Sequence, residues 1–208
     1  MIISKINIWR GKVYIYLDSG ENFELSKPVF EESRLKTGDE ISCAQKENLI
    51  NTNEIFLIKA SSLRILERRE HSAKELKDKL LKKGFSENNI RQVLKNLIEL
   101  NFLNDERFAE IYVRSRIKYK RKSPKAIYFE LLKKGVDKEL IENELRNLDE
   151  EIILDNARAL AKKKLISLNN RNSGNKLDKL RSHLTYKAYS SRIINQIIEE
   201  TRKEVNDA

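Results

Sequence analysis

The densest cluster of chemically active side chains in the sequence is a run of cations near the middle of the chain. No Asp or Glu lies between Ile111 and Lys125, and aromatic rings are interleaved at Tyr112, Tyr119 and Tyr128. Cations at this density suit phosphate oxygens, and a neighbouring aromatic ring can stack on a base. The alternative is a solvated face with cations near a helix C-terminus, and we favour binding over it. The run consists of Arg114, Arg116, Lys118, Lys120, Arg121, Lys122 and Lys125.

Smaller groups of cations recur along the chain and widen the candidate surface. A lysine pair precedes each of the glycines Gly84 and Gly135, three consecutive lysines lie further on, and Arg68 and Arg69 follow a leucine-rich segment. The helix dipole also favours cations at the end of a helix, and for the lysine pairs we favour this structural role. For the two arginines, helix capping and partner contact stay open as equal alternatives. These further candidates are Arg68, Arg69, Lys82, Lys83, Lys133, Lys134, Lys162, Lys163 and Lys164.

The sequence offers little for catalysis. Its two histidines, His71 and His183, have no Cys or carboxylate partner at the spacing of metal ligands. No phosphate-binding glycine loop, nucleophile elbow or zinc-protease signature occurs in it. We therefore expect a protein that is not an enzyme and that uses no metal and no cofactor.

The distribution of charge indicates a polyanionic partner. Residues 1–59 contain 8 basic and 9 acidic residues, whereas residues 60–208 contain 34 basic and 23 acidic ones, a net charge of +11. Such a field attracts nucleic acid above all, with an anionic membrane or an acidic protein surface as competitors. Cys43 is the single cysteine, and we see no secretory signal and no apolar run that would cross a bilayer. We expect a cytoplasmic protein that does not span a membrane.

Helices must position these cations, and the helical part of the sequence is internally repeated. From Ser72, and again from Ser123, Leu or Ile occurs at offsets 4, 8, 9, 18 and 22, with Gly at offset 12. A third, diverged copy begins at Lys176 and has Ala188 in place of the glycine. The pattern predicts a helix, a left-handed break and a second helix. Ser123 is the expected N-cap, with Pro124 at the first helical position.

Another helical segment precedes each copy, so that the repeating unit has three helices. These segments are residues 61–69, 105–119 and 150–167. Units of this kind bury a core only by stacking on their neighbours, and three of them predict a mainly α, elongated and curved array. The predicted units are residues 59–103, 104–148 and 149–208.

The first part of the chain has the alternation of β-strands. Polar and apolar residues alternate over residues 12–17 and 22–25, with Asp and Gly in the turn between them, and Ile2, Ile6 and Ile8 indicate one more strand. We predict a small N-terminal β-rich extension. It and a connection fill residues 1–58.

Several single residues receive structural roles at this stage. The connection ends in a short strand at residues 55–58, and Trp9 takes a half-buried packing position on its strand. Ser86 should cap the helix that follows the first glycine break, and Asp105 is the expected N-cap of the segment after it. Phe102 is assigned to the core.

Two stretches of the sequence resemble the RecX family. The segment from Arg68 to Leu76, followed by Lys83-Gly84-Phe85, is similar to the opening of the first RecX repeat. A second stretch looks like the second RecX repeat in both residue identity and spacing. It consists of Phe102-Leu103-Asn104-Asp105-Glu106-Arg107-Phe108-Ala109, then Ser123-Pro124 and Lys134-Gly135-Val136-Asp137. Ser123 stands where the family usually has Gly, and Tyr186-Lys187-Ala188 replaces a Lys-Gly turn in the third repeat.

The resemblance implies a regulator in DNA repair, homologous recombination and the SOS response. Such a protein binds the RecA recombinase filament on single-stranded DNA, either touching the DNA directly or through RecA, and inhibits strand exchange, ATP hydrolysis and co-protease activity. We expect it to be a monomer. Two alternatives stay open: a helical nucleic-acid-binding module that needs no RecA, and, more weakly, a DNA-processing enzyme built from scattered carboxylates.

Overall fold

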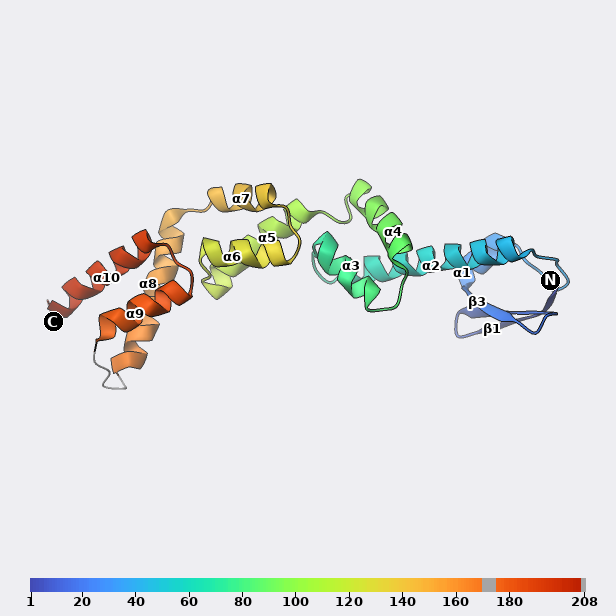
Figure 1. Ribbon diagram of the computed structural model, residues 1–208, viewed down its shortest axis with the longest axis horizontal. Coiled ribbons are helices and arrows are strands. Elements are labelled where there is room, and N and C mark those ends of the chain that lie inside the picture. Colours follow the sequence, from blue (N-terminus) through green and yellow to red (C-terminus); the bar gives the residue numbers. More distant parts are fainter. Residues whose placement is uncertain (170–174, 207–208) are drawn as a thin grey trace. The chain divides into compact units, whose positions relative to one another are not determined.

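The computed structural model of the chain describes residues 1–169 and 175–206. It divides into two compact units, residues 1–103 and residues 104 onward. The first unit begins with a small antiparallel sheet, and the rest of the described chain is helical (Figure 1). The predicted fold class, a mainly α chain of tandem three-helix repeats with a small N-terminal β extension, is confirmed.

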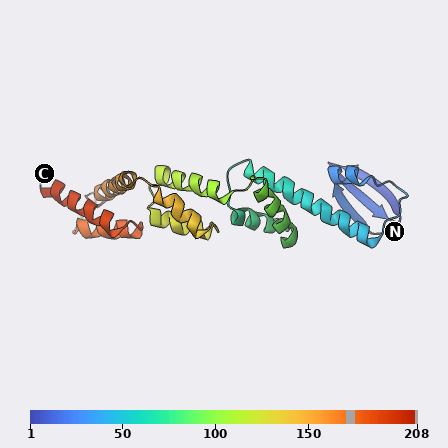
Figure 2. The same ribbon diagram turned by 90° about the horizontal axis from the view of Figure 1, so that it is seen from above.

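Three strands form the N-terminal sheet, in the order β1-β2-β3. They are β1 (Ile3–Trp9), β2 (Lys12–Leu17) and β3 (Asn22–Ser26). Both pairings are antiparallel, with Ile6 opposite Ile15 and Val13 opposite Leu25. The predicted hairpin and the additional first strand are therefore correct, and Figure 2 shows a short helix, α1 (Lys27–Ser33), beside this sheet.

Two helices follow the sheet, α1 (Lys27–Ser33) and α2 (Cys43–Leu66). The prediction of a connection with a short strand at residues 55–58 is wrong, because α2 runs through all of that segment. A capping box begins it: the Ser42 hydroxyl accepts from the Gln45 N–H, and the Gln45 side chain accepts from the Ser42 N–H. Buried Asn53 ties α2 to β3 by accepting the Ser26 N–H at 2.7 Å.

Three helical repeats account for the remainder of the described chain. Repeat 1 combines the second half of α2 with α3 and α4, repeat 2 is α5 to α7, and repeat 3 is α8 to α10. Their bounds are α3 (Ala73–Leu81), α4 (Glu87–Glu99), α5 (Asp105–Lys120), α6 (Pro124–Lys133), α7 (Lys138–Arg146), α8 (Glu150–Asn169), α9 (Lys176–Tyr186) and α10 (Ser191–Asn206).

The turn between the second and third helix of each repeat has the predicted geometry. Gly84 and Gly135 have φ of +86° and +80°, and Ala188 adopts the same left-handed region at +59°. Ser72 and Ser123 are the N-caps of α3 and α6, the helices before these turns, and their hydroxyls accept hydrogen bonds from backbone N–H groups at 3.1 and 3.2 Å. The register of all three copies is therefore correct, the diverged third one included.

Two of the predicted caps differ from the structure. The N-cap of α5 is Asn104, whose side chain accepts from the Arg107 N–H at 2.9 Å, and Asp105 is the first helical residue. Ser86 is at the N-cap of α4 but makes no cap bond, because its N–H and hydroxyl both donate to Glu54 of α2. This contact joins the first and third helices of repeat 1.

Two aromatic residues are more exposed than predicted. Phe102 has 52% of its surface exposed and so lies outside the core. Trp9 is 59% exposed, because it lies at the end of an edge strand, where the Arg10 guanidinium lies 4.7 Å from the centre of its ring. The half-buried packing role assigned to Trp9 is therefore wrong.

Each repeat has a core of its own, built from the leucine and isoleucine stripes of its helices, so the expectation that the units bury a core only by stacking on their neighbours is wrong. Leu80, Leu131 and Leu184 occupy the same repeat position and have no exposed surface. Leu148 packs against the cores of both repeats 2 and 3, which belong to the same compact unit. Burial of these stripes holds the helices at the angles that present their outer faces.

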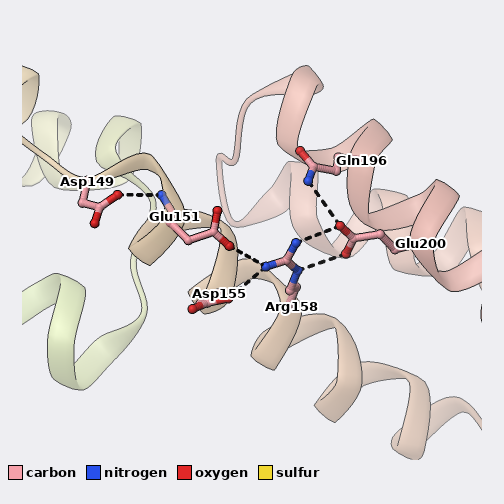
Figure 3. A network of polar contacts seen from close by, with 6 residues as sticks. All are labelled: Asp149, Glu151, Asp155, Arg158, Gln196 and Glu200. Carbon is pink, nitrogen blue, oxygen red and sulfur yellow. Dashed lines mark hydrogen bonds and ion pairs between the residues drawn. The ribbon is translucent and has the colours of Figure 1, made fainter.

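Repeat 3 is also closed by a network centred on Arg158 of α8 (Figure 3). Its guanidinium donates to both carboxylate oxygens of Glu200 on α10, at 2.9 and 3.1 Å, and to Glu151 and Asp155 of its own helix. Gln196 donates to the same Glu200 carboxylate at 3.2 Å. The bidentate contact fixes α10 against α8, and it lowers the pKa of Glu200.

Substitutions at the turn between the second and third helix should separate the free-energy cost of the left-handed conformation from the contribution of packing. No atom lies within 4 Å of a Cβ built on Gly84, so Gly84→Ala should lower the free energy of unfolding by about 1 kcal/mol through backbone strain alone. Ala188→Gly should raise it by about 0.5 kcal/mol, because the αL strain it relieves exceeds the added entropy of the unfolded chain. Urea denaturation of both variants measures these differences, and a change of the same sign in both would contradict this explanation.

Candidate polyanion and partner interface

The structure divides the predicted cationic run into residues that face solvent and residues that are used internally. Five members are exposed, and the structure gives four of them no carboxylate partner among the described residues. We call this group of four the α5–α6 basic surface; it consists of Lys118, Lys120, Arg121 and Lys125. Exposed Tyr119 lies within it, with the Lys118 ammonium 5.5 Å from the centre of its ring.

Two members of the run serve an internal cluster around Tyr112 instead. The Arg116 guanidinium lies 4.2 Å from the centre of the Tyr112 ring, and the Tyr112 hydroxyl donates to Glu130 at 2.9 Å. Glu130 also accepts from Lys122 and lies 3.4 Å from Nε of Arg116. The Lys134 ammonium is 5.2 Å from the same ring. Arg116, Lys122 and Lys134 are thus half-buried and held in place by repeat 2 itself.

Glu130 is ionised by this environment. Burial works to raise the pKa of Glu130, but the hydrogen bonds from Lys122 and Tyr112 and the charge of Arg116 outweigh it, so that the pKa lies below its ordinary value. The pKa of Tyr112 is raised, chiefly because the ring is partly buried. Tyr112 therefore stays protonated and donates to Glu130, while the carboxylate compensates the two cations.

The loop that carries the α5–α6 basic surface is fixed to repeat 3. The Tyr189 hydroxyl donates to the carbonyl of Arg121 at 2.9 Å, and the hydroxyl of fully buried Ser123 donates to the carbonyl of Lys187 at 2.8 Å. Burial raises the pKa of Tyr189 to about 12, so this donor keeps its proton at neutral pH. Arg121 itself takes the left-handed conformation, with φ of +48°. The cations are thus presented by a backbone that two repeats hold.

The contact brings a cation to this site that the sequence analysis missed. Lys187 is exposed in the turn between α9 and α10, next to exposed Tyr186. Its backbone carbonyl accepts a hydrogen bond from the Ser123 hydroxyl. The repeat register contained the signal, since Lys187 occupies the position of Lys83 in repeat 1 and Lys134 in repeat 2. Its proximity to the basic loop could not be found from sequence, because it depends on how repeats 2 and 3 pack.

Four further candidates of repeat 1 lie around one surface hollow between α2 and α3. Arg68, Arg69, Lys82 and Lys83 line it together with two cations that the sequence analysis did not select, Arg64 and Lys79. Their spacing was the missed signal, because Arg64 lies one helical turn before Arg68, and Lys79 one turn before Lys82 and Lys83. Arg69 donates to Glu75 at 3.1 Å.

The remaining candidates belong to neither group. Arg114 is exposed and pairs with Glu110 of the same helix. Lys133 is exposed at the end of α6, where the helix dipole favours it, and Lys162 and Lys163 are exposed on α8. Lys164 is half-buried; after burial itself, its charge helps to lower the pKa of His183.

The described residues hold no cluster of three or more His, Cys, Asp or Glu side chains that would bind a metal ion. Over the same residues, no helix combines the length and the apolar character that crossing a bilayer requires. The arrangement is suited to binding a polyanion or an acidic partner by charge. The class that fold and site define is a tandem three-helix-repeat protein with basic outer surfaces.

Comparison with known proteins identifies this class. The sequence matches the descriptions "RecX, first three-helix domain" over residues 59–97 and "RecX, second three-helix domain" over residues 104–145. It is 30% identical to regulatory protein RecX of Clostridium beijerinckii over 92% of this chain and 90% of that protein. With the Clostridium perfringens (strain 13 / Type A) protein of the same name it shares 31% identity, over 94% and 92% of the two chains.

Solved structures agree with the sequence comparison. A crystal structure of regulatory protein RecX superposes with a TM-score of 0.73 at 26% identity, covering 95% of this chain and 98% of the other. RecX from Lactobacillus salivarius gives a TM-score of 0.64 at 30% identity, over 72% and 97% of the two chains. The chain belongs to the RecX family, and its role is that of a RecX-type regulator.

The internal cluster predicts a pH-dependent loss of stability when its carboxylate is removed. Glu130→Gln leaves Arg116 and Lys122 without their counter-charge and should lower the free energy of unfolding at pH 7 by about 1–2 kcal/mol. Because the pKa of Glu130 is lowered in the folded state, its contribution is present above the ordinary carboxyl pKa and is lost as the pH falls through the folded value.

Urea denaturation at pH 7 and near pH 3 measures both effects. The difference in the free energy of unfolding between wild type and Glu130→Gln should be smaller near pH 3 than at pH 7. Glu110→Gln, which removes the exposed partner of Arg114, is the matched control and should change stability by less than about 0.5 kcal/mol at either pH. A Glu130→Gln effect independent of pH would contradict the ionic explanation.

Proposed function

We propose that this protein binds the RecA filament on single-stranded DNA and inhibits its strand exchange, ATP hydrolysis and co-protease activity. Membership of the RecX family supports a regulatory role, and the relatives carry the name regulatory protein RecX. The proposed partner is consistent with a net charge of +10, since both a nucleoprotein filament and its DNA present negative charge.

The observation that supports this function best is the α5–α6 basic surface. Its cations are exposed and have no carboxylate partner in the part of the chain that the structure describes, in contrast to Arg116 and Lys122, which Glu130 compensates. The contacts of Tyr189 and Ser123 hold the loop backbone, so binding need not order it from a flexible state. A fixed group of uncompensated cations beside exposed tyrosines suits a phosphate backbone or an acidic filament surface.

Inhibition would follow from occupancy alone. A bound regulator excludes the filament's own substrates and shifts the equilibrium of RecA between filament and free protein. This mechanism requires no catalytic group, no cofactor and no second copy of the chain. We propose that the protein acts as a monomer in the cytoplasm, and that the predicted cations of repeats 1 and 3 extend the contact along the partner.

The test is RecA-dependent ATP hydrolysis on single-stranded DNA, titrated with this protein at fixed salt concentration. Inhibition at amounts well below one molecule per RecA is the expected result, with a general single-strand-binding protein as the control. Inhibition that appears only when the protein saturates the bare DNA would overturn the proposal. That result would favour a nucleic-acid-binding module that acts without RecA.

Replacing the four members of the α5–α6 basic surface by Ser should weaken binding to RecA-coated DNA and to bare strands. If all four contact phosphates of a single strand, the slope of log K against log salt should become shallower by about 3, since each lost contact contributes about 0.7. Fluorescence anisotropy at several salt concentrations measures the slope.

The matched control removes four exposed cations that lie elsewhere, Lys27, Lys36, Lys59 and Lys95. Its net charge equals that of the first variant, so it reports the effect of charge without the effect of position. Its slope should stay close to that of the wild type. Equal slopes for the two variants would remove the α5–α6 basic surface from the interface.

A further inference from the structure

The hollow of repeat 1 has a volume of about 500 Å³ and is lined by the second half of α2, by α3 and by the segment between them. Arg64 lies in the last turn of α2 and Arg68 just after that helix ends, and Lys79 in the last turn of α3 is followed by Lys82 and Lys83 just beyond its end. The six cations that converge on this space are Arg64, Arg68, Arg69, Lys79, Lys82 and Lys83.

These cations are largely uncompensated. The structure pairs Arg69 with Glu75, but among the described residues it gives the side chains of the other five no hydrogen bond and no ion pair. Like charges held around one hollow repel each other, and a bound anion removes that repulsion. His71, which is 3% exposed, lines the hollow and donates from Nδ1 to the Arg69 carbonyl at 2.9 Å. A rigid side chain therefore closes one side of it.

In repeat 2, side chains of the protein itself occupy the position that corresponds to this hollow. In the repeat register, Ser61 corresponds to Tyr112 and Lys79 corresponds to Glu130. Repeat 2 thus places an aromatic ring and a carboxylate among its cations, and the Tyr112 hydroxyl and Lys122 both donate to that carboxylate. Repeat 1 has a small side chain in place of the ring and a further cation in place of the carboxylate.

We propose that the hollow between α2 and α3 is a binding site for closely spaced phosphate groups, which take the place that Glu130 holds in repeat 2. The arginines at the end of α2 provide planar donors for phosphate oxygens, and the lysines at the end of α3 provide point charges. Both a free polyphosphate, such as that of a nucleotide, and the phosphates of a DNA strand have this chemistry. The site shares no residue with the α5–α6 basic surface, and its binding of phosphate can be measured without RecA.

The probe is inorganic tripolyphosphate, and isothermal titration calorimetry of the full chain measures its binding. We expect a single saturable site. Lys79→Glu introduces the carboxylate of repeat 2, and Ser61→Tyr introduces its ring without changing charge. Each should weaken binding at least about tenfold, the scale of one lost charged contact. Lys95→Glu changes charge equally at an exposed position of α4 outside the hollow and should stay within about twofold of wild type.

Three results would overturn the proposal. They are binding that does not saturate, equal weakening by Lys79→Glu and Lys95→Glu, and binding of hexaglutamate as tight as that of tripolyphosphate. Thermal unfolding checks that the variants are folded. If Ser61→Tyr is not, Lys79→Glu decides alone, because its side chain is exposed and its substitution removes no contact of the core.

The two histidines offer an independent readout by proton NMR. The pKa of His71 is lowered, first by burial and further by the charges of Arg69 and Lys79. A phosphate bound beside these cations should raise the pKa of His71, whereas His183 of repeat 3 should titrate as before. Equal shifts of both histidines would indicate general screening of charge and would contradict a discrete site.

Competition with an unmodified single-stranded oligonucleotide distinguishes the two sources of phosphate. Displacement of tripolyphosphate by the strand, lost in Lys79→Glu but kept in Lys95→Glu, assigns the hollow to the DNA backbone. Tripolyphosphate binding that persists on saturating DNA assigns it to a free polyphosphate. Both outcomes support a phosphate site, and they differ in the ligand that occupies it.

Discussion

The whole helical part of the chain depends on one constraint, the reversal of direction between two short helices. Gly84, Gly135 and Ala188 meet it by adopting positive φ at the same repeat position. The reversal turns the second helix so that its stripe faces the first, and it buries residues such as Leu131 completely. Two helices of this length bury too little surface to be stable alone, so the preceding helix has to close each core. The three-helix unit is the smallest arrangement that satisfies the turn and the core together.

Small cores leave most of each helix exposed, so the outer faces can vary while the reversal is kept. Lys79, Glu130 and His183 occupy the same position in the three repeats. In repeat 1 this position faces a cationic hollow, in repeat 2 it compensates cations, and in repeat 3 burial and the charges of Lys164 and Lys187 lower the pKa of the histidine. The repeat therefore specifies where a side chain lies, and the residue at that place decides its chemistry.

Sequence patterns predicted the repeats because each helix of a pair packs against one core, so that its apolar residues recur with a single helical period. They failed over residues 43–58 for the opposite reason. Leu49 and Phe56 of α2 pack against the core of the sheet, whereas Ile55 and Ile58 pack against the core of repeat 1. A helix with apolar residues on different faces for two cores shows no single stripe, and its short apolar run at residues 55–58 then looks like a strand. The misplaced cap at Asp105 has a local cause, since Asn104 and Asp105 are both good N-caps.

The interface was harder to predict than the fold, because charge along the sequence does not show which cations are compensated. The run from Arg114 to Lys125 contains no acidic residue, yet Glu130 lies in the second turn of the next helix and pairs with Arg116 and Lys122. Those two cations stabilise repeat 2 at the expense of their availability to a partner. Binding by charge requires cations whose field is not already cancelled. In repeat 2 the ring of Tyr112 fills the space among the cations, whereas the small Ser61 at the same position of repeat 1 leaves that space open. The difference between a basic protein and a binding site is thus set by the few carboxylates and rings placed among its cations.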